Sequence, residues 1–222
     1  MPINHYIFIL ILSFPIQNYA WFFSSSSRKP FLVFLESSGD RKNTGRTIGD
    51  TYESTLTLII AQALKTKVLE LDPSIKIIIN RSPGEEIIPL QNANFSNKIN
   101  TDLYISINAF AQTTPKPSIY IYQFSYADNT ISKYDDLTFY PIDKIYLMNE
   151  LQTTSWNTII HQALLTNKLV EVYGIYKIPC KPLLGIKASA CALEFGLNNQ
   201  TDWQLSIDSI ATAILTIINH KQ

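Results

Sequence analysis

The chain has very few of the residues that usually hold transition metals: its 222 residues include 3 histidines and 2 cysteines. Cys180 and Cys191 are too widely spaced to form the close pair of a zinc knuckle. In an exported protein they can form a disulfide bond. Cys191 lies in an apolar run typical of a buried strand, however, and a packed free thiol explains it equally well. The sequence therefore excludes a metal site made of closely spaced cysteines.

A surplus of charge is also absent, because 18 Lys and Arg residues balance 18 Asp and Glu residues. Proteins that bind nucleic acids use a surplus of basic side chains to displace counterions from phosphates, so no nucleic-acid partner is expected. Hydrophobic residues make up 46% of the chain and charged residues 16%. This composition excludes general disorder and provides enough apolar side chains for one buried core.

No Lys or Arg precedes the first apolar run, which covers residues 6–16. This run is short for a permanent membrane helix, and the small residue Ala20 offers a cleavage site for a signal peptidase. We predict an export signal over residues 1–20, a spacer over 21–30 and one folded domain over 31–222. The protein would then reach the periplasm or cell envelope. Because signal peptides usually begin with basic residues, a buried N-terminal strand or helix is the alternative.

Apolar runs and helical periodicity alternate along the rest of the chain. Continuous apolar runs predict buried strands, and apolar residues three or four positions apart predict helices. Strands are predicted over residues 31–35, 76–79, 103–107, 118–122 and 188–195, and helices over 51–69, 91–99 and 205–218. Residues 126–146 have no clear period and are interpreted as a loop or insertion. The alternation predicts a single-domain α/β fold whose mainly parallel mixed sheet has helices on both faces.

Four features occur in a fixed order along this pattern. Glu53 opens the first predicted helix, and Arg81 follows the second strand; residues 101–111 read T-D-L-Y-I-S-I-N-A-F-A, and residues 192–199 read A-L-E-F-G-L-N-N. The order resembles the zinc-dependent N-acetylmuramoyl-L-alanine amidases of bacterial cell walls. Those enzymes have a glutamate at the first helix, a Thr-Arg pair, an S-I-H-A-N-A stretch and a glutamate on the late strand. The resemblance implies an amidase-like fold, with peptidoglycan or a muropeptide as partner.

The same resemblance implies roles for individual residues. Glu53 has the position of the zinc-ligand glutamate, and Glu194 that of the catalytic general base. Asn108 replaces the ligand histidine of S-I-H-A, and the loop at residues 36–40, E-S-S-G-D, lacks the family's other ligand histidine. An asparagine carbonyl oxygen is a poor zinc donor compared with an imidazole nitrogen. No cofactor is therefore expected, and zinc is expected only if the protein is an active amidase.

The histidines elsewhere offer no obvious replacement ligand. His5 lies in the predicted signal, His220 is near the C-terminus, and His161 lies in a stretch typical of a helix surface. The remaining candidates are oxygen donors, which suit calcium or magnesium better than zinc. They are Glu53, Asn108 and Glu194, joined by Glu36 or Asp40.

The retained acidic residues also have ordinary structural explanations. An acidic residue in the first helical turn, such as Glu53, is favoured by the helix dipole whatever the function. Glu194 can be a strand-end carboxylate that pairs with Arg81 or Arg46. Arg81 is also a candidate ligand-binding residue by its position after the second strand.

Three functions remain open. The first is an exported, non-catalytic amidase-like protein that binds muropeptide or regulates a cell-wall enzyme. The second is an active N-acetylmuramoyl-L-alanine amidase that hydrolyses the lactyl-L-alanine amide bond of peptidoglycan with substitute ligands. The third is an unrelated exported α/β binding protein. The first is favoured because Glu53 and Glu194 are retained while both ligand histidines are missing.

Overall fold

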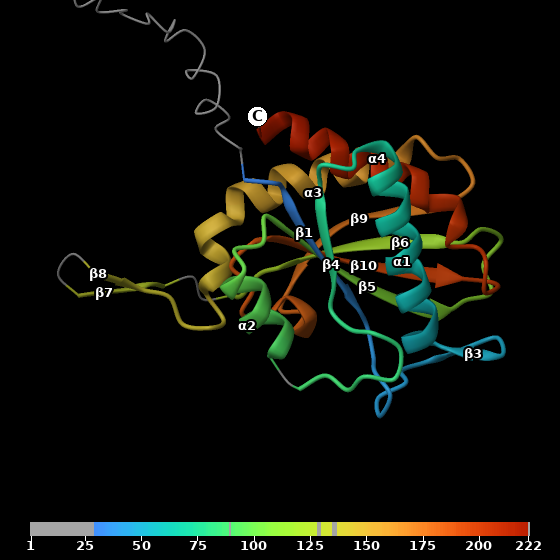
Figure 1. Ribbon diagram of the computed structural model, residues 1–222, viewed down its shortest axis with the longest axis horizontal. Helices are drawn as coiled ribbons and strands as arrows, with labels where there is room; N and C mark the ends of the chain where they lie inside the picture. The colour runs from blue at the N-terminus through green and yellow to red at the C-terminus, as the bar shows by residue number, and fades with distance from the viewer. Residues whose placement is uncertain (1–28, 89, 128–129, 135–136, 222) are drawn as a thin grey trace, which may run out of the picture.

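The apolar runs come together in one six-stranded sheet, with the strand order β4-β1-β5-β10-β6-β9 (Figure 1). The strands are β1 (Leu32–Ser37), β4 (Lys76–Ile79), β5 (Leu103–Ala111), β6 (Ser118–Phe124), β9 (Glu171–Ile178) and β10 (Ser189–Leu197). The first four in spatial order are parallel, β6 is antiparallel to β10, and β9 is parallel to β6. The predicted mainly parallel mixed sheet is therefore confirmed.

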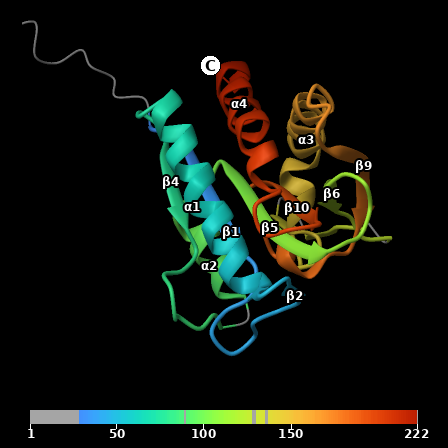
Figure 2. The same ribbon diagram turned by 90° about the vertical axis from the view of Figure 1, so that its right-hand side faces the viewer.

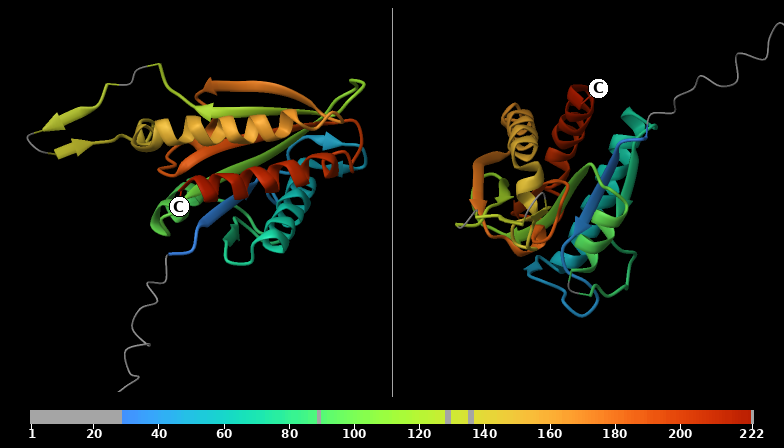
Figure 3. Two further views of the ribbon diagram at one scale, coloured as in Figure 1. Left: turned by 90° about the horizontal axis from the view of Figure 1, so that it is seen from above. Right: turned by 90° about the vertical axis from the view of Figure 1, so that its left-hand side faces the viewer.

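The helices cover both faces of the sheet. They are α1 (Glu53–Leu71), α2 (Gln91–Lys98), α3 (Glu150–Leu165) and α4 (Gln204–Lys221), with the 3-10 helices η1 (Ile145–Asn149) and η2 (Lys181–Leu183). Helices α1, α4 and α3 lie side by side over one face (Figure 2; Figure 3, left). On the other face, α2, η1 and η2 enclose a second, smaller core. The prediction of helices on both faces is confirmed.

Alternation along the strands sends side chains into these two cores. In β5, Leu103 and Ile105 enter the larger core, whereas Tyr104 enters the smaller core and stacks on Phe34 at 5.1 Å between ring centroids. All four side chains are fully buried. Burial of a large apolar side chain contributes about 1.5–3 kcal/mol, so the two cores fix which face each strand residue occupies.

One edge strand and two short two-stranded ribbons were not predicted from the sequence. Strand β9 is an edge strand with mostly exposed residues, so it lacks the continuous apolar run that marks a buried strand. Strands β2 (Thr47–Ile48) and β3 (Thr51–Tyr52) form a small ribbon before α1. The segment interpreted as a loop or insertion contains another ribbon, β7 (Ser132–Tyr134) and β8 (Leu137–Phe139), which projects from the body (Figure 1; Figure 3, left).

The computed structural model describes residues 29–221 except 89, 128–129 and 135–136. The predicted export signal over residues 1–20, and all but the end of the predicted spacer, lie outside the described residues. Within the described residues, no helix is both long and apolar enough to span a bilayer.

Candidate functional site

Three residues singled out in the sequence meet at the carboxyl ends of β5 and β10. Asn108 and Glu194 are direct partners in the parallel ladder between these strands. Glu53, in the first turn of α1, reaches the same edge and accepts a hydrogen bond from the backbone N–H of Ala109 at 3.1 Å. The β2–β3 ribbon and the start of α1 lie beside this edge in Figure 1.

Glu53 is buried, with 5% of its surface exposed, and its carboxylate holds two segments of backbone. Oε1 accepts from Ala109 and Oε2 accepts from the backbone N–H of Arg46 at 3.2 Å. Gly45 makes this approach possible, because a Cβ there would lie 2.6 Å from Oε2 of Glu53. Its φ of 73° is also a conformation that favours glycine. Both carboxylate oxygens of Glu53 are therefore engaged with the protein's own backbone.

Arg46 extends from the same loop to Glu194. Its Nη1 lies 2.6 Å from Oε1 of Glu194, and Tyr122 donates its hydroxyl to Oε2 at 2.8 Å. The guanidinium also lies 5.7 Å from the ring centroid of Phe110, within cation–π range. Burial alone would lower the Arg46 pKa, but the hydrogen bond and charge of Glu194 outweigh it and raise the pKa. Of the two arginines suggested for Glu194, the structure selects Arg46.

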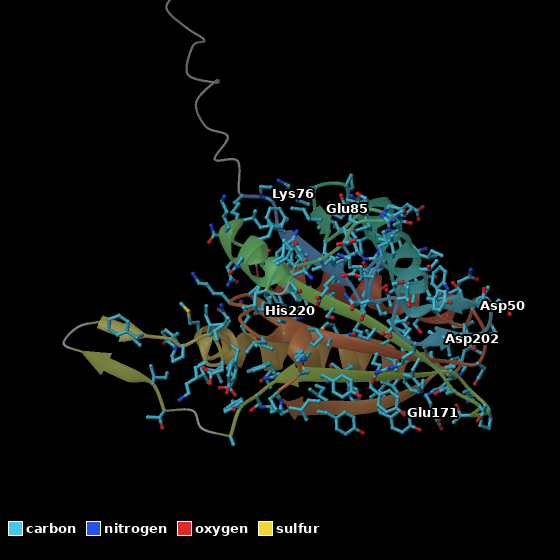
Figure 4. The ribbon with its side chains drawn as sticks, turned by 90° about the horizontal axis from the view of Figure 1, so that it is seen from below. Asp50, Lys76, Glu85, Glu171, Asp202 and His220 are labelled. Atoms are coloured by element: carbon cyan, nitrogen blue, oxygen red, sulfur yellow. The ribbon has the colours of Figure 1, made fainter. Side chains whose placement is uncertain are left out.

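The Arg46–Glu194 pair lies at the end of a partly open sheet surface. Seen from the side of α2, the strands β6 and β9 near Glu171 are not covered by a helix (Figure 4). Arg46 and Glu194 face a shallow depression there that also includes Thr47, Phe110 and Ala111. The pair is thus accessible to a ligand from solvent.

Asn108 faces a different space. Its Nδ2 donates to Oγ of Ser106 at 3.1 Å, and both residues line a cavity of about 570 Å³ between the ends of β1 and β5 and the helices α2 and η2. Glu36 and Asn92 line the same cavity and are joined by a 2.8 Å hydrogen bond from Nδ2 of Asn92. Asn108 therefore separates this cavity from the Arg46–Glu194 pair.

Arg81 and Asp40 hold the loop that follows β1. Arg81 is buried and donates to the backbone carbonyls of Ser54 at 2.5 Å and Ser38 at 3.4 Å, and its burial lowers its pKa. Asp40 accepts from the backbone N–H of Asn43 at 2.7 Å, the main cause of its pKa of about 2. Both residues therefore stabilise the loop next to the site.

The residues at this edge do not suit zinc, the metal that the resemblance implies. By the resemblance, the loop after β1 would need to supply an imidazole. Within that loop Gly39 is tightly enclosed, because a Cβ there would be 2.7 Å from the Asn43 carbonyl oxygen and 2.8 Å from Cβ of Ser54. Glu53 is engaged with backbone N–H groups and Glu194 with Arg46. Across the described residues, no group of three or more His, Cys, Asp or Glu side chains could hold a metal ion.

The remaining metal-binding residue types lie elsewhere. His161 is partly exposed on α3, as its pattern predicted, and His220 is exposed in the last turn of α4. His5 lies outside the described residues. Cys180 and Cys191 are free thiols, and burial raises their pKa values to about 11 and about 12.

Two contributors to the site, Tyr122 and Asn92, were not predicted as site residues from the sequence. Tyr122 alternates with apolar residues in β6, which is the pattern of any ordinary strand and does not mark a functional residue. Asn92 lies in the first turn of α2 and reaches Glu36 across 56 sequence positions. Neither contact has a local signature, because both depend on how the chain folds back on itself.

Comparison with solved structures gives one consistent fold. The catalytic domain of CwlV, an N-acetylmuramoyl-L-alanine amidase from Bacillus (Paenibacillus) polymyxa var. colistinus, is similar at 15% identity and a TM-score of 0.61, over 86% of this chain and 97% of that one. The amidase of Mycobacterium smegmatis is similar at 12% identity and a TM-score of 0.64, over 86% and 97%. The CwlD amidase of Clostridioides difficile, in complex with the GerS lipoprotein, is similar at 15% identity and a TM-score of 0.56, over 86% and 99%.

Sequence comparison alone finds no such relationship: no family model and no curated protein matches the chain. The identities to the solved structures are low enough that they establish the fold and nothing finer. The chain therefore has the fold of N-acetylmuramoyl-L-alanine amidase catalytic domains.

Proposed function

We propose that this protein is an exported, non-catalytic relative of the N-acetylmuramoyl-L-alanine amidases, which binds peptidoglycan or muropeptides in the cell envelope. The observation that carries the proposal is the 2.6 Å contact between Arg46 and Glu194. By resemblance, Glu194 has the position of the general base. A base that must take a proton from water is poorly suited to that task while a guanidinium binds one oxygen and the Tyr122 hydroxyl the other.

The donor set supports the same conclusion. The protein supplies its own cation, the Arg46 guanidinium, which pairs with Glu194 and interacts electrostatically with Glu53. By resemblance, Asn108 offers an amide in the position of an imidazole. Catalytic zinc sites use three protein ligands and leave a position open for water, with imidazole as the common neutral ligand. The chemistry of these side chains favours binding over hydrolysis.

A regulatory role at the wall agrees with the fold. CwlD, which shares the fold, was solved as a complex with a lipoprotein, so a protein of this shape can present a surface to a protein partner. We therefore include a cell-wall enzyme among the expected partners. A calcium or magnesium ion bound by the oxygen donors is not part of the proposal, because Glu53 and Glu194 are already engaged within the protein.

Purified sacculi test the proposal directly. We expect the protein to sediment with sacculi without releasing stem peptides, as measured by gel densitometry and mass spectrometry. Calorimetry with zinc should show no tight stoichiometric binding. The matched variants are Glu194→Gln, at the site, and Glu171→Gln, on the neighbouring edge strand; neither should change peptide release from the blank.

Two results would contradict the proposal in different ways. Release of stem peptides by the native protein and by Glu171→Gln, but not by Glu194→Gln, would show a working amidase that hydrolyses the lactyl-L-alanine bond. Failure to sediment with sacculi of any source would show that the protein does not bind the wall.

A further inference from the structure

The cavity beside the candidate site has an apolar mouth and a polar floor. The mouth consists of residues from the loop before α2 and from η2 and its end, and the floor of polar residues from β1, β5 and α2. The apolar lining residues are Ile87, Ile88, Leu90, Ala93, Pro182 and Leu184. A volume of about 570 Å³ is in the range of pockets that enclose small ligands.

Two apolar residues at the mouth are unusually exposed for their type. Ile88 has 70% of its surface exposed and Leu90 has 42%. Leu90 also has a φ of 62°, a left-handed conformation that costs a non-glycine residue about 1–2 kcal/mol. The surrounding structure thus holds an apolar side chain at the cavity mouth at a conformational cost, which is common where a segment has a binding role.

The polar floor contains a carboxyl group with spare hydrogen-bonding capacity. Glu36 accepts one hydrogen bond at Oε1, from Asn92. Its Oε2 is enclosed beside the hydroxyls of Ser106 and Tyr104 but has no hydrogen bond of normal geometry within the described residues. An ionised carboxylate offers about four acceptor positions, so most of this capacity is unused. Burial raises the pKa of Glu36, although the neighbouring Ser106, Asn92 and Tyr104 side chains act to lower it.

The other charges around the cavity do not compensate Glu36. Asp40 also lines the cavity, but its Oδ1 accepts from the backbone of its own loop and its Oδ2 from the backbone N–H of Ile87. The nearby Arg81 guanidinium also interacts with its charge. Lys181 lines the cavity from an exposed position on η2 and is not among the groups that influence the Glu36 pKa. A positively charged ligand head would therefore meet an uncompensated carboxyl group at the floor.

We propose that this cavity binds a small amphipathic amine, with its ammonium group against the Glu36 carboxyl and its apolar part against Ile88, Leu90 and Leu184. The amine can be a free molecule or a side chain carried by a peptide, since both present the same head and stem. The cavity lies on the far side of Asn108 from the Arg46–Glu194 pair, and amine binding does not require that the protein bind peptidoglycan.

Nuclear magnetic resonance titration of the ¹⁵N-labelled protein tests this site. The probes are n-hexylamine, 1-hexanol and hexanoate, which share a stem and differ in the head group. Nα-acetyl-lysine methylamide is the peptide-borne amine. We expect n-hexylamine to shift the amide signals of Ser106, Asn108 and Leu184 in a saturable manner, with about tenfold tighter binding than 1-hexanol.

Three variants test whether the Glu36 carboxyl group is responsible for amine binding. Glu36→Gln keeps the shape of the side chain and should weaken n-hexylamine binding about tenfold, to the level of 1-hexanol. Ile88→Lys, at an exposed position, places a second cation at the mouth and should also weaken the amine without changing the thermal midpoint. Glu70→Gln is the matched control, about 25 Å along α1 from Glu53, and should bind the amine as the native protein does.

The outcomes are distinct. Tight binding of both amines supports a site for peptide-borne amines, and binding of n-hexylamine alone supports a site for free amines. The proposal would be overturned if 1-hexanol or hexanoate bound as tightly as n-hexylamine. It would also be overturned if both Glu36→Gln and Ile88→Lys kept the native affinity for the amine, or if no saturable shift occurred at the cavity. None of these results depends on binding to sacculi, so this inference and the proposed function fail separately.

Discussion

The Arg46–Glu194 pair should contribute a measurable but small part of the stability of the fold. A double-mutant cycle isolates it: Arg46→Met removes the guanidinium but keeps an apolar stem near Phe110, and Glu194→Gln removes the negative charge. Contacts that only one partner makes, such as the weak hydrogen bond from Arg46 to the carbonyl of Ala109 at 3.4 Å, cancel in the coupling term.

The expected coupling follows from the exposure of the two side chains. At about 4 Å between charges, the attraction is about 1 kcal/mol in water and about 4 kcal/mol at an effective dielectric constant of about 20. The Arg46 side chain is 54% exposed and that of Glu194 is 17% exposed, so solvent screens the pair and the lower value is the better guide. We expect a coupling of about 1 kcal/mol, equivalent to a shift of about 2–4 °C in the thermal midpoint.

Urea denaturation of the native protein, both single variants and the double variant provides the measurement. Lys42–Glu86 is the matched control pair, because its atoms also lie 2.6 Å apart but its side chains are 72% and 44% exposed. Its coupling should be near zero. In about 1 M salt, the Arg46–Glu194 coupling should fall because the screening length is then about 3 Å. A coupling equal to that of the control pair, or one that rises with salt, would refute this reasoning.

Three further predictions concern buried groups near the site and in the cores. Glu53→Gln should lower the free energy of unfolding in urea by about 1–3 kcal/mol, because the amide N–H₂ would face a backbone N–H group that donates to the carboxylate in the native protein. The pKa of Asp40 falls from 3.8 to about 2 on folding, mainly through the Asn43 N–H, so its stabilisation is complete above about pH 4 and is lost as pH falls toward 2. Asp40→Asn should flatten stability across that window, and an unchanged slope would contradict the assignment. Cys191 is fully buried and Cys180 is partly buried, with pKa values of about 12 and about 11, so both should react with Ellman's reagent at pH 8 much faster after unfolding. Rapid labelling of Cys191 in the native protein would contradict its burial.

Most strands of the sheet and the helices α1, α2 and α4 were predicted from the sequence, because apolar periodicity marks the residues that become buried. Strand β5 and helix α1 were located from their own residues, since each buries a continuous run or a regular stripe. Strand β9 could not be located in this way, because at the edge of the sheet its residues are mostly exposed and obey no burial pattern.

The site was predictable only in part, for a related reason. Asn108 and Glu194 were grouped through the family resemblance, and the structure pairs them directly. The choice between Arg46 and Arg81 as the partner of Glu194 could not be made from sequence. It depends on the path of the loop after β1, which Asp40, Arg81 and the positive φ angles of its glycines fix only once the fold has formed.

These contacts explain how the loop after β1 can keep its position without a shared metal. In the family that the chain resembles, zinc would join that loop, the first helix and the strand equivalent to β5. Here Glu53 joins α1 to β5 through Ala109, and Arg81 joins the loop to α1 through the carbonyls of Ser38 and Ser54. Arg46 then ties the loop to β10 through Glu194. Since hydrogen bonds connect the same elements, the position of the loop after β1 does not depend on a metal, as the proposed function requires.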